Sequence, residues 1–240
     1  MEINITVMPL SFRKDIILGG TTIGSYYESA SGLISGRGLD PSFGPFASLA
    51  DMVSIYKTYF SETHRRSNTK CGIGASVLGT NEDIDIITNE LVYIVPNGHQ
   101  KRRHDISFPD LNTAQTIIDA TPISSYPSFF DGPDGLYEFV NNLIGGIRNV
   151  GPLTVYDTAI RIGQNLTPIV EPLDFVYIPA SGPLDGARKF FSSFLRMPSP
   201  PIVSGPSRIA IRHFGILTSA PFFLTPFEIE DLLCVFHKYI

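Results

Sequence analysis

The chain has few cysteines and no pattern that would let them bind a metal. Only Cys71 and Cys234 occur among 240 residues, and neither belongs to a CxxC pair. A structural zinc site needs about four clustered Cys or His ligands, so no metal is expected. Two single cysteines indicate a reducing compartment or at most one disulfide bond. We therefore expect a cytoplasmic protein.

Long hydrophobic runs are also lacking. No apolar run reaches the roughly 18 residues that a membrane-spanning helix needs. The opening residues, MEINITVMPLSFRKDIIL, do not show the basic start and long apolar run of a secretory signal. We expect no membrane partner.

Positive charge is in deficit, with 18 Lys and Arg against 23 Asp and Glu and a net charge of −5. Proteins that coat nucleic acid without specificity are normally basic, so this class is disfavoured. A local basic patch remains open. The most basic stretch contains Lys101, Arg102 and Arg103 between two histidines, and it is either a solvated loop or a phosphate contact.

The named cofactor and catalytic motifs are absent. The chain has no GxGxxG or GK[ST] phosphate loop, no GxSxG or HExxH motif and no calcium-binding loop. We expect no cofactor, and the sequence leaves open whether the protein is an enzyme.

The composition is that of a globular protein, since 43% of the residues are hydrophobic. The 19 prolines and 21 glycines are scattered, which predicts many short elements. Helical patterns outnumber strand-like runs, so we predict a mainly α protein with a few short strands. We expect one domain over residues 1–240, with an irregular part at about 1–46, a helical core at 47–240 and a proline-rich connection at 198–206.

Periodicity and capping residues place the elements. The clearest boundary is a helix start at Thr225, where Pro226 and Glu228 complete a capping box. The other predicted elements are helices over Phe46–Glu62, Asn81–Val95, Leu111–Ala120 and Ala187–Leu195, a helical pair over 134–166, strands over Glu2–Met8 and Asp174–Pro179, and a glycine-rich turn over Ala180–Gly186.

The centre of the prediction is the helical pair, whose turn falls at Asn149-Val150-Gly151. Gly151 can take a positive φ or allow another backbone to approach closely. Pro152 suits the first turn of a helix, and Asn149 tolerates the left-handed region.

The segment Ile147–Val155, IRNVGPLTV, resembles the hairpin of helix-hairpin-helix proteins, which include DNA glycosylases. In that family, backbone N–H groups at the turn hold a nucleic-acid phosphate, as a positive helix end can. The resemblance covers about residues 143–166 and implies a phosphate site at Asn149, Gly151 and Thr154. The basic residues 101–103 would then make a second contact.

Three departures from the family pattern weaken this interpretation. Arg148 stands where proline is usual, and Asn149 replaces the first glycine. Leu153 replaces a lysine that contacts phosphate and, in the glycosylases, serves as nucleophile. The alternative is a hairpin that only packs in a core.

Asp157 is the candidate catalytic residue. The segment Tyr156–Arg161, YDTAIR, resembles the surroundings of the catalytic aspartate in helix-hairpin-helix glycosylases, although that aspartate lies about twenty residues after the hairpin glycine. One interpretation places Tyr156, Asp157 and Arg161 around a pocket. The other is an ion pair between Asp157 and Arg161, four residues apart on one helix.

Two functions of different classes remain. The first is a nucleic-acid-interacting protein related to the helix-hairpin-helix DNA glycosylases, active in DNA repair or base processing. The second is a non-enzymatic protein–protein interaction or regulatory module, in which the hairpin is structural and the Gly/Ser-rich loop at 29–45 and aromatic residues make the contacts.

Overall fold

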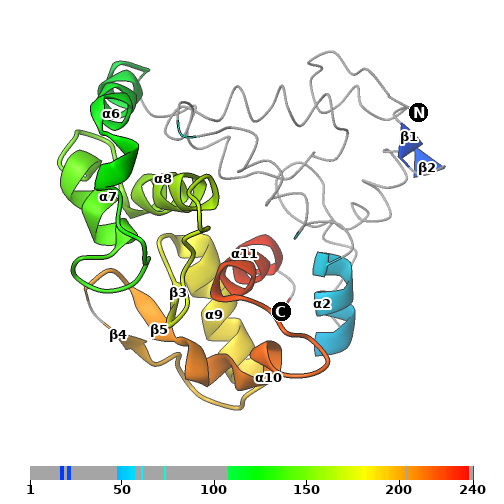
Figure 1. The fold of residues 1–240 in the computed structure, drawn as a ribbon. Helices are drawn as coiled ribbons and strands as arrows, with labels where there is room; N and C mark the ends of the chain where they lie inside the picture. The colour runs from blue at the N-terminus through cyan, green and yellow to red at the C-terminus, as the bar shows by residue number, and fades with distance from the viewer. Residues whose placement is uncertain are drawn as a thin grey trace.

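The computed structural model describes residues 48–57, 61, 73, 108–203, 205–237 and 240, and the backbone of two short strands at 17–18 and 21–22. The predicted strand Glu2–Met8, the helix Asn81–Val95, most of the irregular part at 1–46 and the basic stretch with Lys101, Arg102 and Arg103 lie outside these residues. The described part is mainly helical, as predicted, and contains one small three-stranded sheet (Figure 1).

The helices and strands follow each other in short segments. The helices are α2 (Leu49–Tyr56), α6 (Phe108–Ala120), α7 (Leu136–Ile144), α8 (Pro152–Gln164), α9 (Ser181–Ser193), α10 (Gly215–Thr218) and α11 (Pro226–Phe236), with 3-10 turns η4 (Ile123–Ser125) and η5 (Ile211–Phe214). The strands are β1 (Ile17–Leu18), β2 (Thr21–Thr22), β3 (Phe175–Tyr177), β4 (Ile202–Val203) and β5 (Arg208–Ala210).

Several boundaries confirm the sequence signals. Helix α11 begins with the complete capping box, in which Thr225 and Glu228 each accept from the other's backbone N–H. Helix α6 ends at Ala120 as expected, and β3 lies within the predicted strand. Helix α2 starts at Leu49, three residues later than predicted, because the Ser48 side chain caps it by accepting from the N–H of Asp51.

Other boundaries correct the prediction. The residues Ala180–Gly186 are no turn, since α9 begins at Ser181 and contains Pro183 in its first turn, where proline is tolerated. The proline-rich connection 198–206 includes β4, an exposed edge strand paired with β5. Within the part predicted to be irregular, Thr21–Thr22 pairs with Ile17–Leu18 as a two-stranded ladder.

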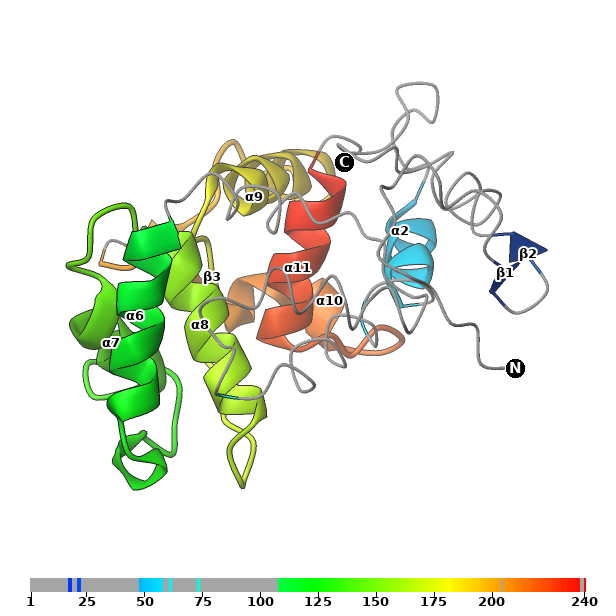
Figure 2. The same ribbon diagram turned by 90° about the horizontal axis from the view of Figure 1, so that it is seen from above.

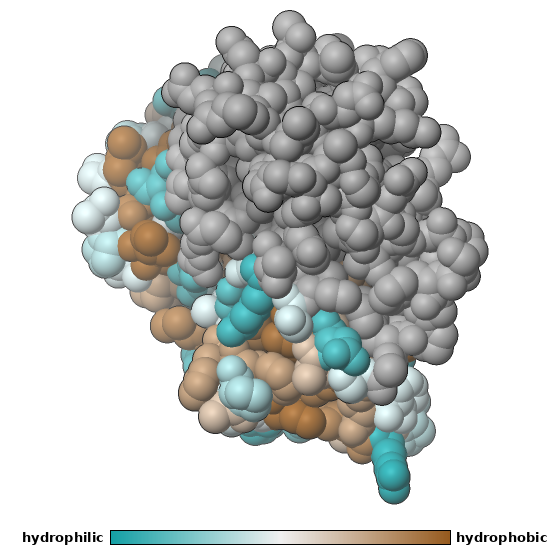
Figure 3. All heavy atoms as spheres, turned by 90° about the vertical axis from the view of Figure 1, so that its right-hand side faces the viewer, coloured by the Kyte–Doolittle hydropathy of each residue, from teal (hydrophilic) through white to brown (hydrophobic). Residues whose placement is uncertain are grey.

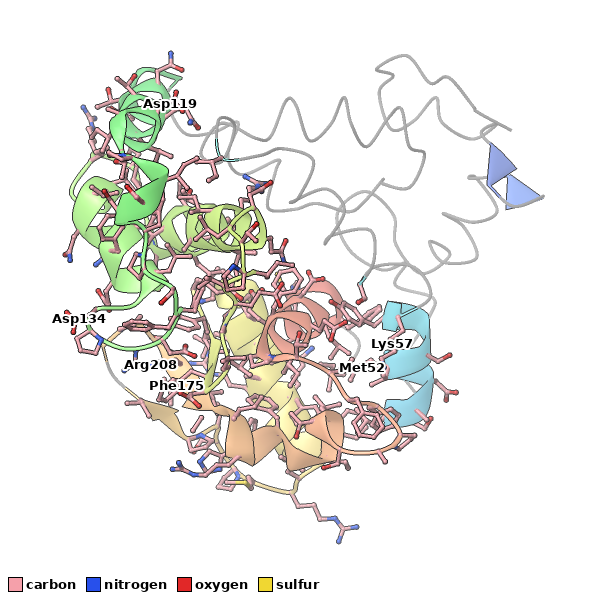
Figure 4. The ribbon with its side chains drawn as sticks, in the orientation of Figure 1. Met52, Lys57, Asp119, Asp134, Phe175 and Arg208 are labelled. Atoms are coloured by element: carbon pink, nitrogen blue, oxygen red, sulfur yellow. The ribbon has the colours of Figure 1, made fainter. Side chains whose placement is uncertain are left out.

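The sheet has the order β3-β5-β4 with antiparallel neighbours. Val176 of β3 and Ile202 of β4 both pair with Ile209 of β5. In two perpendicular views, α11 lies between α2 on one side and α8 and α9 on the other (Figures 1 and 2). Met52 of α2 points toward α11, where it is buried (Figure 4).

Helices α9 and α11 pack closely because two glycines lie on the α9 surface that faces α11. A Cβ atom at Gly186 would collide with the Leu233 carbonyl, and one at Gly182 would lie 3.2 Å from the Cys234 Sγ atom. Glycine at these two positions therefore allows the helices to approach closely. The glycines of this stretch are explained by helix packing and do not require a turn.

The buried apolar side chains form two clusters. The α9–α11 core joins α2, α9, α10 and α11, and the α7–α8 core joins α6, α7 and α8. Strand β3 contributes to both, since Val176 lies in the first cluster and Tyr177 in the second. Helix α11 does the same, with Phe227 in the α7–α8 core and Leu232 in the α9–α11 core.

Some apolar side chains are exposed. Figure 3 shows hydrophobic residues on the lower part of the face that carries α2 and α10. Ile216 on α10 and Phe223, in the loop to α11, are exposed, and Phe223 has φ 51°. Among the described residues, no helix combines the length and apolar character that crossing a membrane requires.

Candidate functional site: the turn between α7 and α8

The turn connects the end of α7 to the start of α8 over residues 145–151. Helix α7 ends at Ile144, earlier than predicted, because Gly145 and Gly146 follow it and glycine is costly inside a helix. Ile147 is half-buried and Val150 is buried, and both belong to or pack against the α7–α8 core. The turn is thus anchored by two apolar side chains.

Asn149 sets the backbone conformation of the turn and connects the turn to α6. Its φ is 64°, in the left-handed region predicted for it. Its side-chain Nδ2 donates to the Oδ2 atom of Asp110, in the first turn of α6, at 2.9 Å. Asn149 therefore ties the turn to α6, and its amide is engaged within the fold.

Gly151 lies at the start of α8 and does not behave as predicted. Its φ is −95° and its ψ 176°, which is extended backbone, and no described atom outside its chain neighbours lies within 4 Å of a Cβ built at this position. Gly151 is therefore not in the left-handed region, and no described group approaches it closely.

The N–H groups of the first turn of α8 have no acceptor within the helix, and no side chain among the described residues caps them. Pro152, at the first helical position, is exposed. Thr154 is buried, so its side chain is not available to a phosphate. A helix start that is uncapped and open favours an anion.

Two charges of opposite sign lie at this turn. Arg148 is exposed and has no hydrogen bond or ion pair within the described residues. The carboxylate of Asp110 is adjacent through Asn149 and disfavours an anion. The turn therefore carries one charge of each sign.

The predicted catalytic and pocket residues lie in the next turns of α8. Tyr156 belongs to the buried α7–α8 core, Arg161 is buried and Asp157 is half-buried. The Tyr156 ring stacks on Tyr177 with centroids 5.5 Å apart. Asp157 and Arg161 each interact with another group. Burial encloses Tyr156 and Arg161, and the pocket around these residues stays a prediction.

Two buried carboxyl groups on α11 were not among the residues predicted from the sequence. Glu230 and Asp231 are buried on α11, and the Tyr56 hydroxyl donates to the Asp231 Oδ2 atom at 2.8 Å. Burial raises the pKa of Glu230 well above its usual value, and Asp231 and Asp157 raise it further. Two adjacent carboxylates inside the apolar run Ile229–Leu233 were the available signal.

A third polar group lies on the sheet. The Arg208 guanidinium lies over the Phe175 ring, 4.5 Å from its centroid (Figure 4). The pKa of Tyr177 is raised, mainly by burial and then by Asp131, while Arg208 opposes the shift. Asp131 also accepts from the N–H of Leu173 at 2.8 Å, which fixes the loop before β3. These contacts are structural.

Within the described ranges, no three His, Cys, Asp or Glu side chains converge in a way that could hold a metal ion. The chain matches no protein-family model, and comparison with characterised proteins and with solved structures finds none that is similar to it.

Proposed function

We propose that the turn between α7 and α8 binds the phosphate backbone of a nucleic acid. The observation that carries the proposal is the uncapped start of α8, with open space beside Gly151. Backbone N–H groups and the positive end of a 13-residue helix favour a phosphate there. The local resemblance of residues 143–166 to helix-hairpin-helix proteins supports the same ligand.

Arg148 and Asp110 set the strength of this interaction. The exposed guanidinium of Arg148 adds attraction for phosphate. Asp110 subtracts from it, because its carboxylate lies beside the turn. The expected affinity is modest and depends on salt, since the chain carries a net charge of −5.

The experiment measures the binding of fluorescein-labelled duplex DNA and single-stranded RNA at low salt by anisotropy. Gly151→Val should weaken binding by about tenfold or more, because valine fits the extended backbone but fills the space that the phosphate needs. Gly215→Val is the matched control, as Gly215 is also open and lies at α10. It should bind like the native protein.

Two charge variants test the same turn in opposite directions. Asp110→Asn removes the negative charge but keeps an oxygen that can accept from Asn149, so binding should tighten by about two- to fivefold. Arg148→Ala should weaken binding. If the native protein binds neither nucleic acid at low salt, the proposal fails. If binding is insensitive to all these changes, the hairpin is not the site.

A second function, a protein-interaction module, is favoured by exposed apolar side chains at the opposite end of the helical pair. Ile169 is 58% exposed and Leu173 74%, in the loop that follows α8. Phe129, before α7, is 50% exposed. Replacing Ile169 and Leu173 with Ser should abolish partner binding and leave phosphate binding intact. A double variant that still binds its partner rules out this surface.

A further inference from the structure

Buried polar groups lie where α11, which contributes Phe227 to the α7–α8 core, meets that core, and two of their atoms lack a described hydrogen-bond partner. We call this contact the seam and define it by Tyr156 of α8 and by Glu230 and Asp231 of α11. Tyr156 is 1% exposed and Glu230 3%. The Tyr156 hydroxyl and the Glu230 Oε1 atom have no hydrogen-bond partner among the described residues.

The seam joins parts of the chain that otherwise pack separately. Tyr156 belongs to the α7–α8 core. Glu230 follows Ile229, which belongs to the α9–α11 core. Glu230 therefore lies on a helix that contributes to both cores.

The two described carboxyl groups that influence Glu230 both disfavour its charge. Asp231 on the same helix and Asp157 on α8 raise its pKa, after the larger effect of burial. Burial raises the pKa of Tyr156, and Glu230 and Asp231 across the seam raise it further. The hydroxyl of Tyr56 on α2 already donates its hydrogen bond to Asp231. No described cation contributes to the pKa of Glu230.

We propose that the seam is a protonation-controlled contact, which closes when Glu230 is neutral and loosens when this carboxyl group ionises. An unpartnered carboxylate between two apolar clusters would be desolvated without compensation. Ionisation therefore favours a state in which α8 separates from α11 and water reaches Glu230. The proposal is independent of phosphate binding at the turn.

The sign of the pH effect follows from linkage. Glu230 holds its proton more tightly in the closed seam than in the opened one, where its pKa approaches the ordinary 4.5. Its stabilising contribution is fully present below that value and is lost as the pH rises toward the raised pKa. The opening constant should increase by up to about tenfold per pH unit in this window and then level off.

The test is amide hydrogen exchange of the native protein between pH 5 and 9, corrected for intrinsic exchange rates. Peptides from α8 and α11 should lose protection as the pH rises. Glu230→Gln has the shape of the neutral carboxyl and should remove this pH dependence. Glu138→Gln is the control, since Glu138 is half-buried on α7 away from the seam, and the pH dependence should persist.

A second measurement does not depend on any variant folding. The carboxyl carbons of the native protein, followed by NMR during a pH titration, should include one glutamate that titrates well above the ordinary range. The proposal is overturned if all glutamates titrate normally, if protection in α8 and α11 does not change with pH, or if Glu230→Gln retains the native pH dependence.

Discussion

Two buried tyrosines differ in what their hydroxyl groups do. Tyr56 donates to the Asp231 Oδ2 atom at 2.8 Å, whereas the hydroxyl of Tyr156 has no described partner. Both rings are completely enclosed, so their apolar contributions are similar. Comparing the loss of each hydroxyl group therefore measures how much one buried hydrogen bond contributes to the free energy of unfolding.

Tyr56→Phe should therefore lower the free energy of unfolding by about 1.5–3 kcal/mol, because it removes a hydrogen bond to a charged group. Tyr156→Phe should leave it unchanged or raise it by up to about 1 kcal/mol, because it removes an unpaired buried hydroxyl. Urea denaturation of both variants gives the comparison. Equal losses would mean that Tyr156 has a partner.

At the scale of the element, α9 depends on a glycine that meets another helix. A Cβ at Gly186 would collide with the backbone carbonyl of Leu233 on α11, which cannot move without shifting that helix. Glycine in a helix is otherwise unfavourable by about 0.5–1 kcal/mol relative to alanine. Close packing outweighs this cost in α9.

Gly186→Ala should destabilise the protein by about 1–3 kcal/mol, since the added methyl group overpacks the contact between α9 and α11. Gly215→Ala is the control, because nothing lies near its Cβ position. The control should be neutral or slightly stabilising in a thermal melt. A neutral Gly186→Ala would show that α9 can shift without loss.

The sequence predicted elements well where the signal is local. The capping box at Thr225 depends on neighbouring residues and is confirmed, and Asn149 adopts the left-handed conformation that asparagine tolerates. The prediction of a turn at Ala180–Gly186 was wrong, because these residues begin α9. In the sequence, a glycine that permits helix packing cannot be distinguished from one that permits a turn. Only the position of α11 distinguishes the two.

The candidate site was predictable only in part for the same reason. The turn and the start of α8 follow from residues 147–155. Asp110 lies 39 residues before Asn149 and could not be placed beside it from the sequence. The electrostatic effect of Asp157 on Glu230 also joins residues that are far apart in the sequence. Such contacts decide the charge at the turn and the state of the seam.

At the scale of the whole molecule, the net charge of −5 opposes nucleic-acid binding over long distances. Favourable contacts must therefore be local and few. Arg148 is the cation that the structure places at the turn. The residues Lys101, Arg102 and Arg103 lie outside the described part, and their role in binding stays a prediction.

Salt dependence measures how many of these cations contact phosphate. The plot of log affinity against log salt for duplex DNA should have a slope of about −0.9 per neutralised phosphate. Changing residues 101–103 together to Ala should flatten the slope by up to about three if all of them bind. An unchanged slope would remove this stretch from the interface and leave the turn as the contact.

Strand β3 has a consequence for how the chain avoids misfolding. Its three residues pair with Arg208–Ala210, and successive side chains serve different cores, with Val176 in one and Tyr177 in the other. A slip of one residue would exchange the two faces. The bulky Tyr177 would enter the cluster that now holds Val176, which would leave a hole in its own. A shifted register of β3 on β5 would therefore disrupt the packing of both cores. The two cores together disfavour the misregistered sheet.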